Sequence, residues 1–262
     1  MIHVAVASFL GQNAHKYLVA RLTHLTRDMG VTVDDYGRCE DFLDAINRPG
    51  RVPDVVFIGG GEPDSLLDPD RLRIVRSIAL YCEAVSVPRS VYSCLAAQLY
   101  ATVHFGVNVS RRTTKFFGVF GHGDGNLLIA HSRWNIVHWN SEGSGFSPKY
   151  PCDSNGEPLL WTSIGDDDSQ VVLLQGHPEY ATNMLIREYR RDVARDGATA
   201  EAPIIPMLTD DRNPCSPQNL AAVDRMLEST ARHLIETIMF TPRYERRWRN
   251  DRLVMGLLDD GQ

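Results

Sequence analysis

The sequence lacks several features that would place a protein in a common class. Its five cysteines are an odd number without a CxxC pair, so neither a disulfide framework nor a thiolate zinc site is indicated. No apolar run reaches the roughly 18 residues that span a bilayer, and the chain opens without a basic segment of the signal-peptide type. Its 27 basic and 33 acidic residues leave no excess positive charge for a polyanion. We therefore expect a cytoplasmic protein without nucleic-acid or membrane partners.

Signals for a metal or a nucleotide are also missing. There is no glycine-rich phosphate loop that ends in Lys followed by Ser or Thr, and neither the scattered histidines nor Asp166–Asp168 have a metal-ligand spacing. The basic stretch Arg243–Arg252 contains Tyr244 and Trp248, which could contact a phosphate or a nucleotide. Acidic residues interrupt this stretch, so we favour a solvated face. No metal is expected.

Apolar runs rich in β-branched residues alternate with helical patterns in the first hundred residues. Strands are expected over 2–7, 31–33, 55–58 and 86–92, and helices over about 14–29, 69–82 and 95–104. Such alternation predicts a parallel sheet covered by helices on both faces.

The second half of the chain has a different pattern. From Phe116 to about Leu174, short alternating runs lie between Gly, Asp and Ser clusters, which predicts antiparallel strands and long loops, mainly over about 116–170. Helices are expected over about 182–195 and 217–239, the latter within a C-terminal helix and tail of about 215–262. We predict a single domain over 1–262.

The residues most suggestive of chemistry begin at Cys94, which follows the expected strand 86–92. A nucleophile on a tight turn between a strand and a helix projects from the backbone and meets the positive end of the helix, which favours a thiolate. By itself, Cys94 is equally compatible with a small buried hydrophobic residue. A second motif has to decide between these interpretations.

That motif is the string QGHPEY, Gln175–Tyr180, directly after the apolar run 171–174. Loops at the carboxyl edge of a parallel sheet usually build the site. A thiol nucleophile needs a base, and the base needs a group that fixes its tautomer. Cys94, His177 and Glu179 supply all three types, so we favour this set over an unrelated structural or exposed histidine.

These motifs resemble known families. Cys94 with Gln98, followed by His-Pro-Glu after a later strand, resembles the class I glutamine amidotransferase superfamily, whose nucleophile motif is Gly-x-Cys-x-Gly-x-Gln. The longer string GHPEY at 176–180, followed by EYRRD at 188–192, is more specific. It is similar to the signature of the homoserine O-succinyltransferase and O-acetyltransferase family. Two further segments resemble that family: HSR at 131–133 and KFFGVF at 115–120.

The resemblance implies a fold and an activity. The fold is a flavodoxin-like α/β domain of the class I glutamine amidotransferase type, with a small antiparallel insertion. The activity is transfer of an acetyl or succinyl group from acyl-CoA to the hydroxyl of homoserine or a related small amino acid, a step of methionine biosynthesis. Acyl-CoA would be a co-substrate, with no bound cofactor. Members of this family are often dimers, so a homodimer is a further expectation.

The resemblance also implies roles for the matched residues. Cys94 would accept the acyl group, His177 would act as general base and Glu179 would be its partner. Glu188 and Arg191, three apart on a helix, would hold the ammonium and carboxylate of the acceptor; the alternative is a solvated ion pair. Arg133 would be another substrate contact, or else an isolated surface arginine.

Other expected roles concern the acyl donor. The backbone N–H of Leu95, with that of Gly60 or Gly61, would form an oxyanion hole, whereas the alternative for the glycines is a plain turn. Glu62 stands near the position where the resembling family distinguishes donors, with glutamate favouring acetyl and glycine tolerating succinyl. The alternative is that Glu62 is a solvated loop residue.

The sequence departs from the family pattern at several positions. Leu95 stands where the family usually has tryptophan, Ala96 replaces a glycine, and Ala181 replaces an aspartate after GHPEY. Phe9–His15 stands roughly where the family has a Met-Pro…Lys…Thr-Glu segment. We therefore expect an altered acceptor pocket, and acylation of a different hydroxy or amino substrate in specialised metabolism stays open.

Two rival functions use the same residues differently. An amidotransferase or another amide hydrolase would need glutamine binding, and normally a synthase domain that this chain does not supply; glutaminase activity would favour it. A non-catalytic binding protein that retains the fold would be favoured if Cys94 were alkylated no faster than a free thiol.

Overall fold

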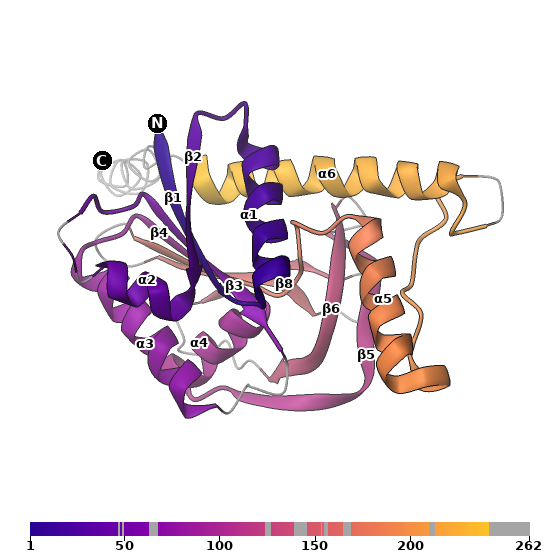
Figure 1. The fold of residues 1–262 in the computed structure, drawn as a ribbon, viewed down its shortest axis with the longest axis horizontal. Coiled ribbons are helices and arrows are strands. Elements are labelled where there is room, and N and C mark those ends of the chain that lie inside the picture. The colour runs from indigo at the N-terminus through magenta and orange to yellow at the C-terminus, as the bar shows by residue number, and fades with distance from the viewer. Residues whose placement is uncertain are drawn as a thin grey trace, which may run out of the picture.

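The computed structural model describes residues 1–46, 48, 50–62, 68–123, 127–138, 146–152, 154, 157–164, 169–209 and 213–240. The predictions for Asp166–Asp168 and for the basic stretch Arg243–Arg252 therefore lie outside the described residues. Within them, strands and helices form a mixed α/β structure with two sheets (Figure 1).

The larger sheet has seven strands in the order β2-β1-β3-β4-β9-β8-β7. Five are mutually parallel and two continue the sheet antiparallel. The parallel strands are β1 (Ile2–Phe9), β2 (Val31–Arg38), β3 (Val55–Gly61), β4 (Arg89–Ser93) and β9 (Gln170–Leu174). The antiparallel strands are β8 (Pro158–Ile164) and β7 (Ser147–Pro151). The mostly parallel sheet agrees with the sequence pattern, and the β9–β4 pairing shows that the run 171–174 belongs to its parallel part.

Helices cover both faces of this sheet. One face packs against α2 (Cys39–Ile46), α3 (Pro69–Ala84) and α4 (Leu95–Phe105), and the other against α1 (Gln12–Thr26) and α6 (Pro217–Phe240). In β1, Ala5 and Ala7 face the first group, whereas Val4 and Val6 face the second. Both sides of the strand are buried, which explains why it is a continuous apolar run rather than an alternating one.

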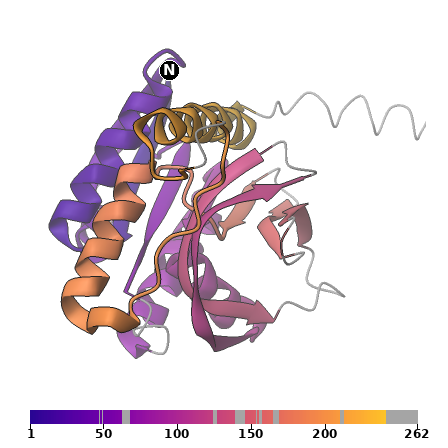
Figure 2. The same cartoon turned by 90° about the vertical axis from the view of Figure 1, so that its right-hand side faces the viewer.

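The smaller sheet is an antiparallel pair of long strands, β5 (Asn108–His122) and β6 (Leu127–His138). It packs against α5 (Thr182–Asp196) and part of α6 through a third apolar cluster (Figure 2). Gly118 of β5 has φ +140°, and a Cβ there would lie 2.3 Å from the carbonyl oxygen of Ile204. Only glycine lets the α5–α6 connection approach β5 so closely.

Helix α5 receives its N-terminal cap from another helix. Ala181, at its N-cap position, provides no side-chain hydrogen bond. Instead, Asp224 of α6 accepts hydrogen bonds from the Thr182 amide at 2.7 Å and the Thr182 hydroxyl at 3.0 Å. A carboxylate at this end also complements the helix dipole. The start of α5 is therefore fixed by α6.

The element bounds agree with the sequence predictions in part. Helix α3 begins at Pro69 as predicted, with Asp68 as N-cap. Helix α1 ends at Thr26, before the predicted end at about 29, and Gly30, with φ +66°, is the last residue of the turn that follows. The predicted start of the fourth strand at Ser86 is wrong, because Ser86 has φ +51° and Val87 N–H donates to Cys82 O, which ends α3. Helix α2 was not predicted, and β5 begins at Asn108 rather than at Phe116.

Candidate active site

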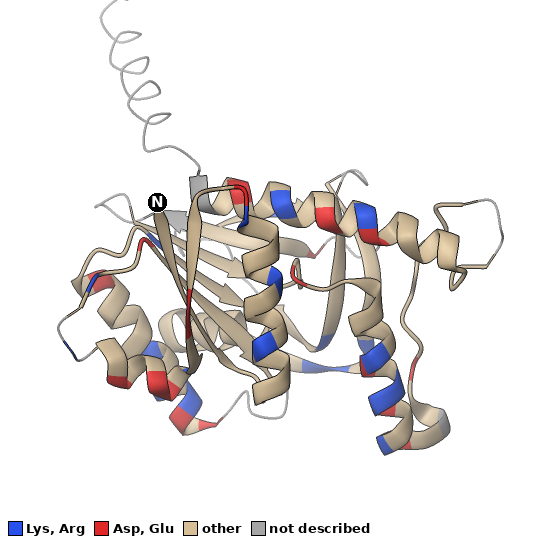
Figure 3. Ribbon diagram, turned by 45° about the horizontal axis from the view of Figure 1, so that its top comes forward, with Lys and Arg blue, Asp and Glu red and all other residues tan. Residues whose placement is uncertain are grey.

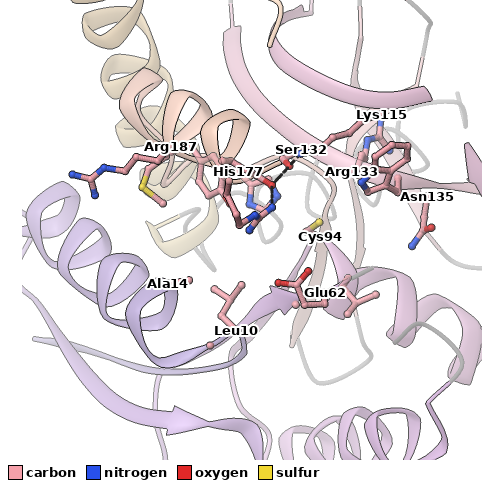
Figure 4. A pocket seen from close by; sticks show the side chains of 18 of the residues that line it. Leu10, Ala14, Glu62, Cys94, Lys115, Ser132, Arg133, Asn135, His177 and Arg187 are labelled. Atoms are coloured by element: carbon pink, nitrogen blue, oxygen red, sulfur yellow. Dashed lines mark hydrogen bonds and ion pairs between the residues drawn. The ribbon is translucent and has the colours of Figure 1, made fainter. Parts of the chain in front are cut away.

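A cavity of about 610 Å³ opens where the parallel strands β1, β3 and β4 end (Figure 4). Its walls come from the β1–α1 connection, the end of β3, the start of α4, the β5–β6 sheet and α5. The carboxyl ends of parallel strands meet at one edge of a sheet, and ligands of α/β proteins usually bind there. The cavity contains Cys94 and His177, both of which were predicted to follow strand ends.

Cys94 occupies the turn between β4 and α4 in a conformation that is rare for a residue with a side chain. Its φ is +51° and its ψ is −114°. The turn is fixed because Cys94 N–H donates to Leu174 O at 2.7 Å and Gln98 N–H donates to Cys94 O at 3.2 Å. The thiol thus stands at the N-terminal end of α4, where the helix dipole favours negative charge. Strained backbone of this kind is concentrated at functional sites.

The glycines at the end of β3 lie directly beside this turn. A Cβ at Gly60 would lie 3.2 Å from Cys94 Cβ and 3.4 Å from the Leu95 nitrogen. Gly60 is also an extra residue in the β1–β3 ladder, because Ser8 pairs with Gly59 and Phe9 pairs with Gly61. A bulge re-aims the backbone. The Gly59–Gly61 segment is therefore more than a plain turn: it brings backbone against the Cys94–Leu95 peptide.

His177 is held from three directions. Its backbone N–H donates to Ala130 O at 2.8 Å, its Nδ1 lies 2.9 Å from Glu179 Oε1, and its ring stacks on Tyr180 with centroids 4.4 Å apart. Because an ionised carboxylate only accepts hydrogen bonds, Nδ1 carries the hydrogen and Nε2 is left to face another group. His177 and Glu179 are both buried.

The electrostatics of His177 connect it to Cys94. Burial lowers the pKa of His177, but the charges of a Cys94 thiolate and of Glu179, with a hydrogen bond to each, outweigh burial and hold this pKa well above the usual value. An imidazole that interacts with a thiolate on one side and a carboxylate on the other favours the protonated form. The structure thus brings together the thiol, imidazole and carboxylate selected from the sequence.

Glu188 and Arg191 lie on the cavity wall, three residues apart on α5, with Glu188 Oε1 3.2 Å from Arg191 Nη2. They are not a simple solvated pair. The same Glu188 oxygen accepts from Lys115 Nζ at 3.2 Å and from Ser132 Oγ at 2.6 Å, and Lys115 is also 2.8 Å from Asp192. Figure 3 shows further basic residues along α5.

Lys115, Ser132 and Asp192 were not expected at the site from the sequence. Lys115 is 4% exposed at its side chain and links β5 to two acidic residues of α5. Lys115, Arg191 and their hydrogen bonds lower the pKa of Asp192, although burial acts in the opposite direction as the largest single effect. All three residues stand inside the matched strings KFFGVF, HSR and EYRRD. The sequence motifs therefore included these residues. They could not show that Lys115 and Ser132 contact acidic residues of α5 more than 50 positions away.

Arg133 is not a surface arginine. It is 3% exposed, ion-paired to Glu157, within 3.4 Å of Gln175 Oε1 and stacked on Phe116. Burial lowers the pKa of Arg133, against the raising effects of Glu157 and a Cys94 thiolate. Arg112 shares the Glu157 carboxylate. Arg133 thus lines the cavity with its charge close to Cys94, but both terminal nitrogens already have protein partners.

Glu62 is exposed and lines the same cavity, across from α5 (Figure 4). Its charge contributes to raising the pKa values of Arg191 and Arg195, after stronger local effects in each case. Glu62 is therefore exposed, as expected of a solvated loop residue. It also faces the cavity, as a residue that distinguishes acyl donors would have to do.

In the described part of the chain, no group of three or more His, Cys, Asp or Glu side chains is arranged to hold a metal ion. None of the helices within the described ranges is both long enough and apolar enough to cross a membrane.

Comparison with known proteins gives a consistent family. A Homoserine O-succinyltransferase family model matches residues 77–218, which is more than half of the chain. The chain is 32% identical over 130 residues to a homoserine O-acetyltransferase of Bacillus subtilis, covering 45% of this chain and 42% of the relative. It is 29% identical over 177 residues to a homoserine O-succinyltransferase of Methylorubrum extorquens, covering 58% and 50% respectively.

A homoserine O-succinyltransferase of Cardiobacterium hominis is 33% identical over 130 residues, which cover 44% of this chain and 36% of the relative. The chain thus spans half or less of the length of these curated relatives. The matched region includes Cys94, His177, Glu188 and Arg191, whereas β1–β3 and almost all of α6 lie outside it. On the extent of the family match, the chain belongs to the homoserine O-succinyltransferase family.

Proposed function

We propose that this protein is an acyltransferase that moves an acetyl or succinyl group from acyl-CoA, through an acyl-enzyme at Cys94, to the hydroxyl of homoserine or a related small amino acid. The observation that carries the proposal is the meeting of Cys94, His177 and the Glu188–Arg191 pair around one cavity. A nucleophile and a zwitterion-binding pair within one site suit a reaction of an amino acid, and the family match favours acyl transfer over hydrolysis of an amide.

In the first step, the Cys94 thiolate attacks the carbonyl carbon of the thioester. The Leu95 N–H and that of Gly60 or Gly61 stabilise the resulting oxyanion, and the tetrahedral intermediate collapses by breaking the bond to the CoA sulfur. The leaving thiolate takes the proton of the His177 imidazolium. The products are acyl-Cys94, free CoA thiol and neutral His177.

The second step uses the neutral imidazole. Among the effects that raise the pKa of His177, the charge of Cys94 is the largest, and acylation removes it. His177 can then accept the proton of the acceptor hydroxyl while that oxygen attacks the acyl-cysteine. Cys94 leaves as a thiolate and restores the starting pair. Glu179 keeps the imidazole in one orientation throughout.

The acceptor is held by opposite charges. Glu188 Oε1 already receives three protein donors, whereas Glu188 Oε2 is buried without a partner among the described residues. We assign Oε2 to the acceptor ammonium, and the half-exposed guanidinium of Arg191 to the carboxylate. Arg133, whose Nη groups are occupied, contributes positive charge beside the reacting carbonyl.

The donor side includes Glu62. Its carboxylate lines the cavity and would repel the terminal carboxylate of a succinyl group, so we propose that acetyl-CoA is the preferred donor. The fold is proposed to be of the flavodoxin-like, class I glutamine amidotransferase type. The parallel strands, the Cys94 turn and the histidine after β9 support this assignment, with residues 1–262 as one domain.

The test is an acceptor screen with the purified chain. Acetyl-CoA and succinyl-CoA are each offered with L-homoserine, L-serine and related hydroxy amino acids, and products are detected by mass. Donor alone should add one acyl group to the peptide that contains Cys94, and Cys94→Ala should abolish both this adduct and product. Product formation at the wild-type rate by Cys94→Ala would refute the mechanism. Glutaminase activity without acyl transfer would favour the amide-hydrolase alternative.

A further inference from the structure

A second hydrogen-bonded set of polar side chains lies beside the cavity, at the end of β1. Ser8 Oγ is 2.8 Å from His15 Nδ1, and His15 Nε2 is 2.7 Å from Asp35 Oδ1. The carboxylate can only accept, so Nε2 carries the hydrogen and Nδ1 accepts from the Ser8 hydroxyl in the neutral imidazole. Leu10 N–H donates to Ser8 Oγ at 3.2 Å, which extends the chain of bonds to a residue of the cavity wall.

These residue types are those of a serine hydrolase, but their burial excludes that role. Ser8 is 1% exposed and His15 is 5% exposed. No substrate carbonyl can reach a hydroxyl that is buried to this extent. The set has to act through the structure around it.

The set lies where the ladders on both sides of β1 lose their regular register. Toward β2, Val6 pairs with Asp35 and Ser8 pairs with Arg38, which leaves an extra residue in β2. Toward β3, the extra residue is Gly60. Regular parallel ladders have evenly spaced hydrogen bonds, and bulges in them are rare. Where the regular ladder is interrupted, side-chain hydrogen bonds involving His15 of α1 and Asp35 of β2 hold the end of β1 instead.

The end of β1 is in turn packed against the glycines beside Cys94. A Cβ at Gly59 would lie 2.8 Å from Ser8 Cβ, and a Cβ at Gly61 would lie 2.7 Å from Phe9 Cβ. Between them, a Cβ at Gly60 would lie 3.2 Å from Cys94 Cβ. A shift of Ser8 or Phe9 is therefore transmitted to the backbone that faces the nucleophile, because no side chain of β3 intervenes.

We propose that Ser8, His15 and Asp35 are positioning residues that hold the end of β1, and through it the Gly59–Gly61 segment, in the geometry needed for acylation of Cys94. The inference rests on the proposed acyl transfer through Cys94. It assigns a role to a part of the chain outside the region matched by the family, where the sequence departs from the family pattern.

The test compares two reactions of the same thiol. Acylation by p-nitrophenyl acetate passes through a tetrahedral oxyanion, whereas alkylation by iodoacetamide is a direct displacement that forms none. Ser8→Ala keeps the Cβ that packs on Gly59 but removes both hydroxyl bonds. We expect acylation of Cys94 to fall at least about tenfold, while alkylation stays within about twofold. Outright removal of one oxyanion donor costs about 10²- to 10³-fold in known enzymes, so a displaced donor should cost part of that.

A matched control and a milder variant accompany it. Thr26→Val removes a buried hydroxyl at the far end of α1, where Thr26 Oγ donates to Leu22 O at 2.8 Å, and should leave both reactions unchanged. Asp35→Asn alters a side chain that is 48% exposed, so the protein should fold even if Ser8→Ala does not. It should lower acylation by a smaller factor, since an amide no longer fixes the His15 tautomer.

The outcomes separate this inference from the proposed function. Wild-type acylation rates in both Ser8→Ala and Asp35→Asn would overturn the inference, as would an equal fall of acylation and alkylation. A wild-type Cys94 that iodoacetamide alkylates but p-nitrophenyl acetate does not acylate would also overturn it. If p-nitrophenyl acetate acylates Cys94 but acetyl-CoA and succinyl-CoA do not, the proposed function is refuted. The positioning role is then decided by the acylation and alkylation rates of Ser8→Ala and Asp35→Asn.

Discussion

Replacing Glu188 by glutamine is the sharpest probe of acceptor binding. Glu188 Oε1 is fixed as an acceptor by Lys115, Ser132 and Arg191, at 3.2, 2.6 and 3.2 Å respectively. In Glu188→Gln, the amide oxygen has to take this position, because three donors point at it. The amide NH₂ group then replaces Oε2, so an acceptor ammonium meets a donor instead of a carboxylate oxygen.

The expected magnitude follows from the lost bond. A hydrogen bond to a charged group contributes about 1.5–3 kcal/mol, which corresponds to a fall of about 10- to 150-fold in kcat/KM for the acceptor. Formation of the acyl-enzyme from donor alone involves no acceptor and should be unchanged. The two steps are measured separately, by steady-state kinetics with varied acceptor and by the rate of the Cys94 adduct.

Glu236→Gln is a suitable control, since Glu236 is exposed on α6 away from the cavity lining. The reasoning would be refuted if Glu188→Gln left acceptor kcat/KM at the wild-type value. It would also be refuted if formation of the acyl-enzyme and transfer to the acceptor slowed by the same factor. That result would mean that Glu188 only stabilises the structure through its contacts with Lys115 and Ser132.

Three further predictions concern the cavity and its surroundings. Arg191→Lys keeps the charge but loses the two-donor fork, so it should weaken acceptor use far more than formation of the acyl-enzyme; unchanged acceptor KM and second-step rate would reduce Arg191 to a surface ion-pair partner. Glu62→Gly should raise kcat/KM for succinyl-CoA relative to acetyl-CoA, and an unaltered donor ratio would remove Glu62 from the donor site. Burial, with the charges of Arg133 and His122, holds the pKa of His131 well below its usual value, so the folded protein resists a proton that the unfolded chain binds. His131 therefore does not reduce the free energy of unfolding above about pH 6.5. Below that pH it reduces the free energy of unfolding by up to about 1.4 kcal/mol per pH unit. In His131→Gln, the urea midpoint of unfolding should fall less between pH 7 and pH 5 than it does in the wild type. An equal fall in both proteins would show that another group is responsible for the pH dependence.

The sequence predicted those parts of the molecule whose signals are local. The Cys94 turn follows from an apolar strand and a helical pattern that meet at one cysteine, and α3 follows from the helical pattern over 69–82. Where a segment is buried on both sides, as in β1, hydrophobicity alone identifies it. The mostly parallel sheet could therefore be anticipated without any knowledge of its strand order.

Features that depend on distant partners could not be predicted. Arg133 could not be recognised as buried, because its partners Glu157, just before β8, and Gln175, just after β9, are distant in the sequence. Lys115 and Asp192 pair over 77 residues, and no periodicity encodes that contact. The His15 network involves three ordinary polar residues, so only the tertiary structure reveals that they converge beside the glycines of β3.

The cap that Asp224 provides for α5 has a consequence for the order in which the protein is made. During synthesis, α5 emerges before α6, and its own first turn contains neither an acidic residue nor a capping side chain. Until α6 docks, the Thr182 amide lacks its partner, and the helix that carries Glu188 and Arg191 is free to fray from its start. A nascent chain can thus form the parallel sheet and the Cys94 turn while the cavity wall that carries Glu188 and Arg191 is still incomplete. The last described helix to leave the ribosome is the one that completes it.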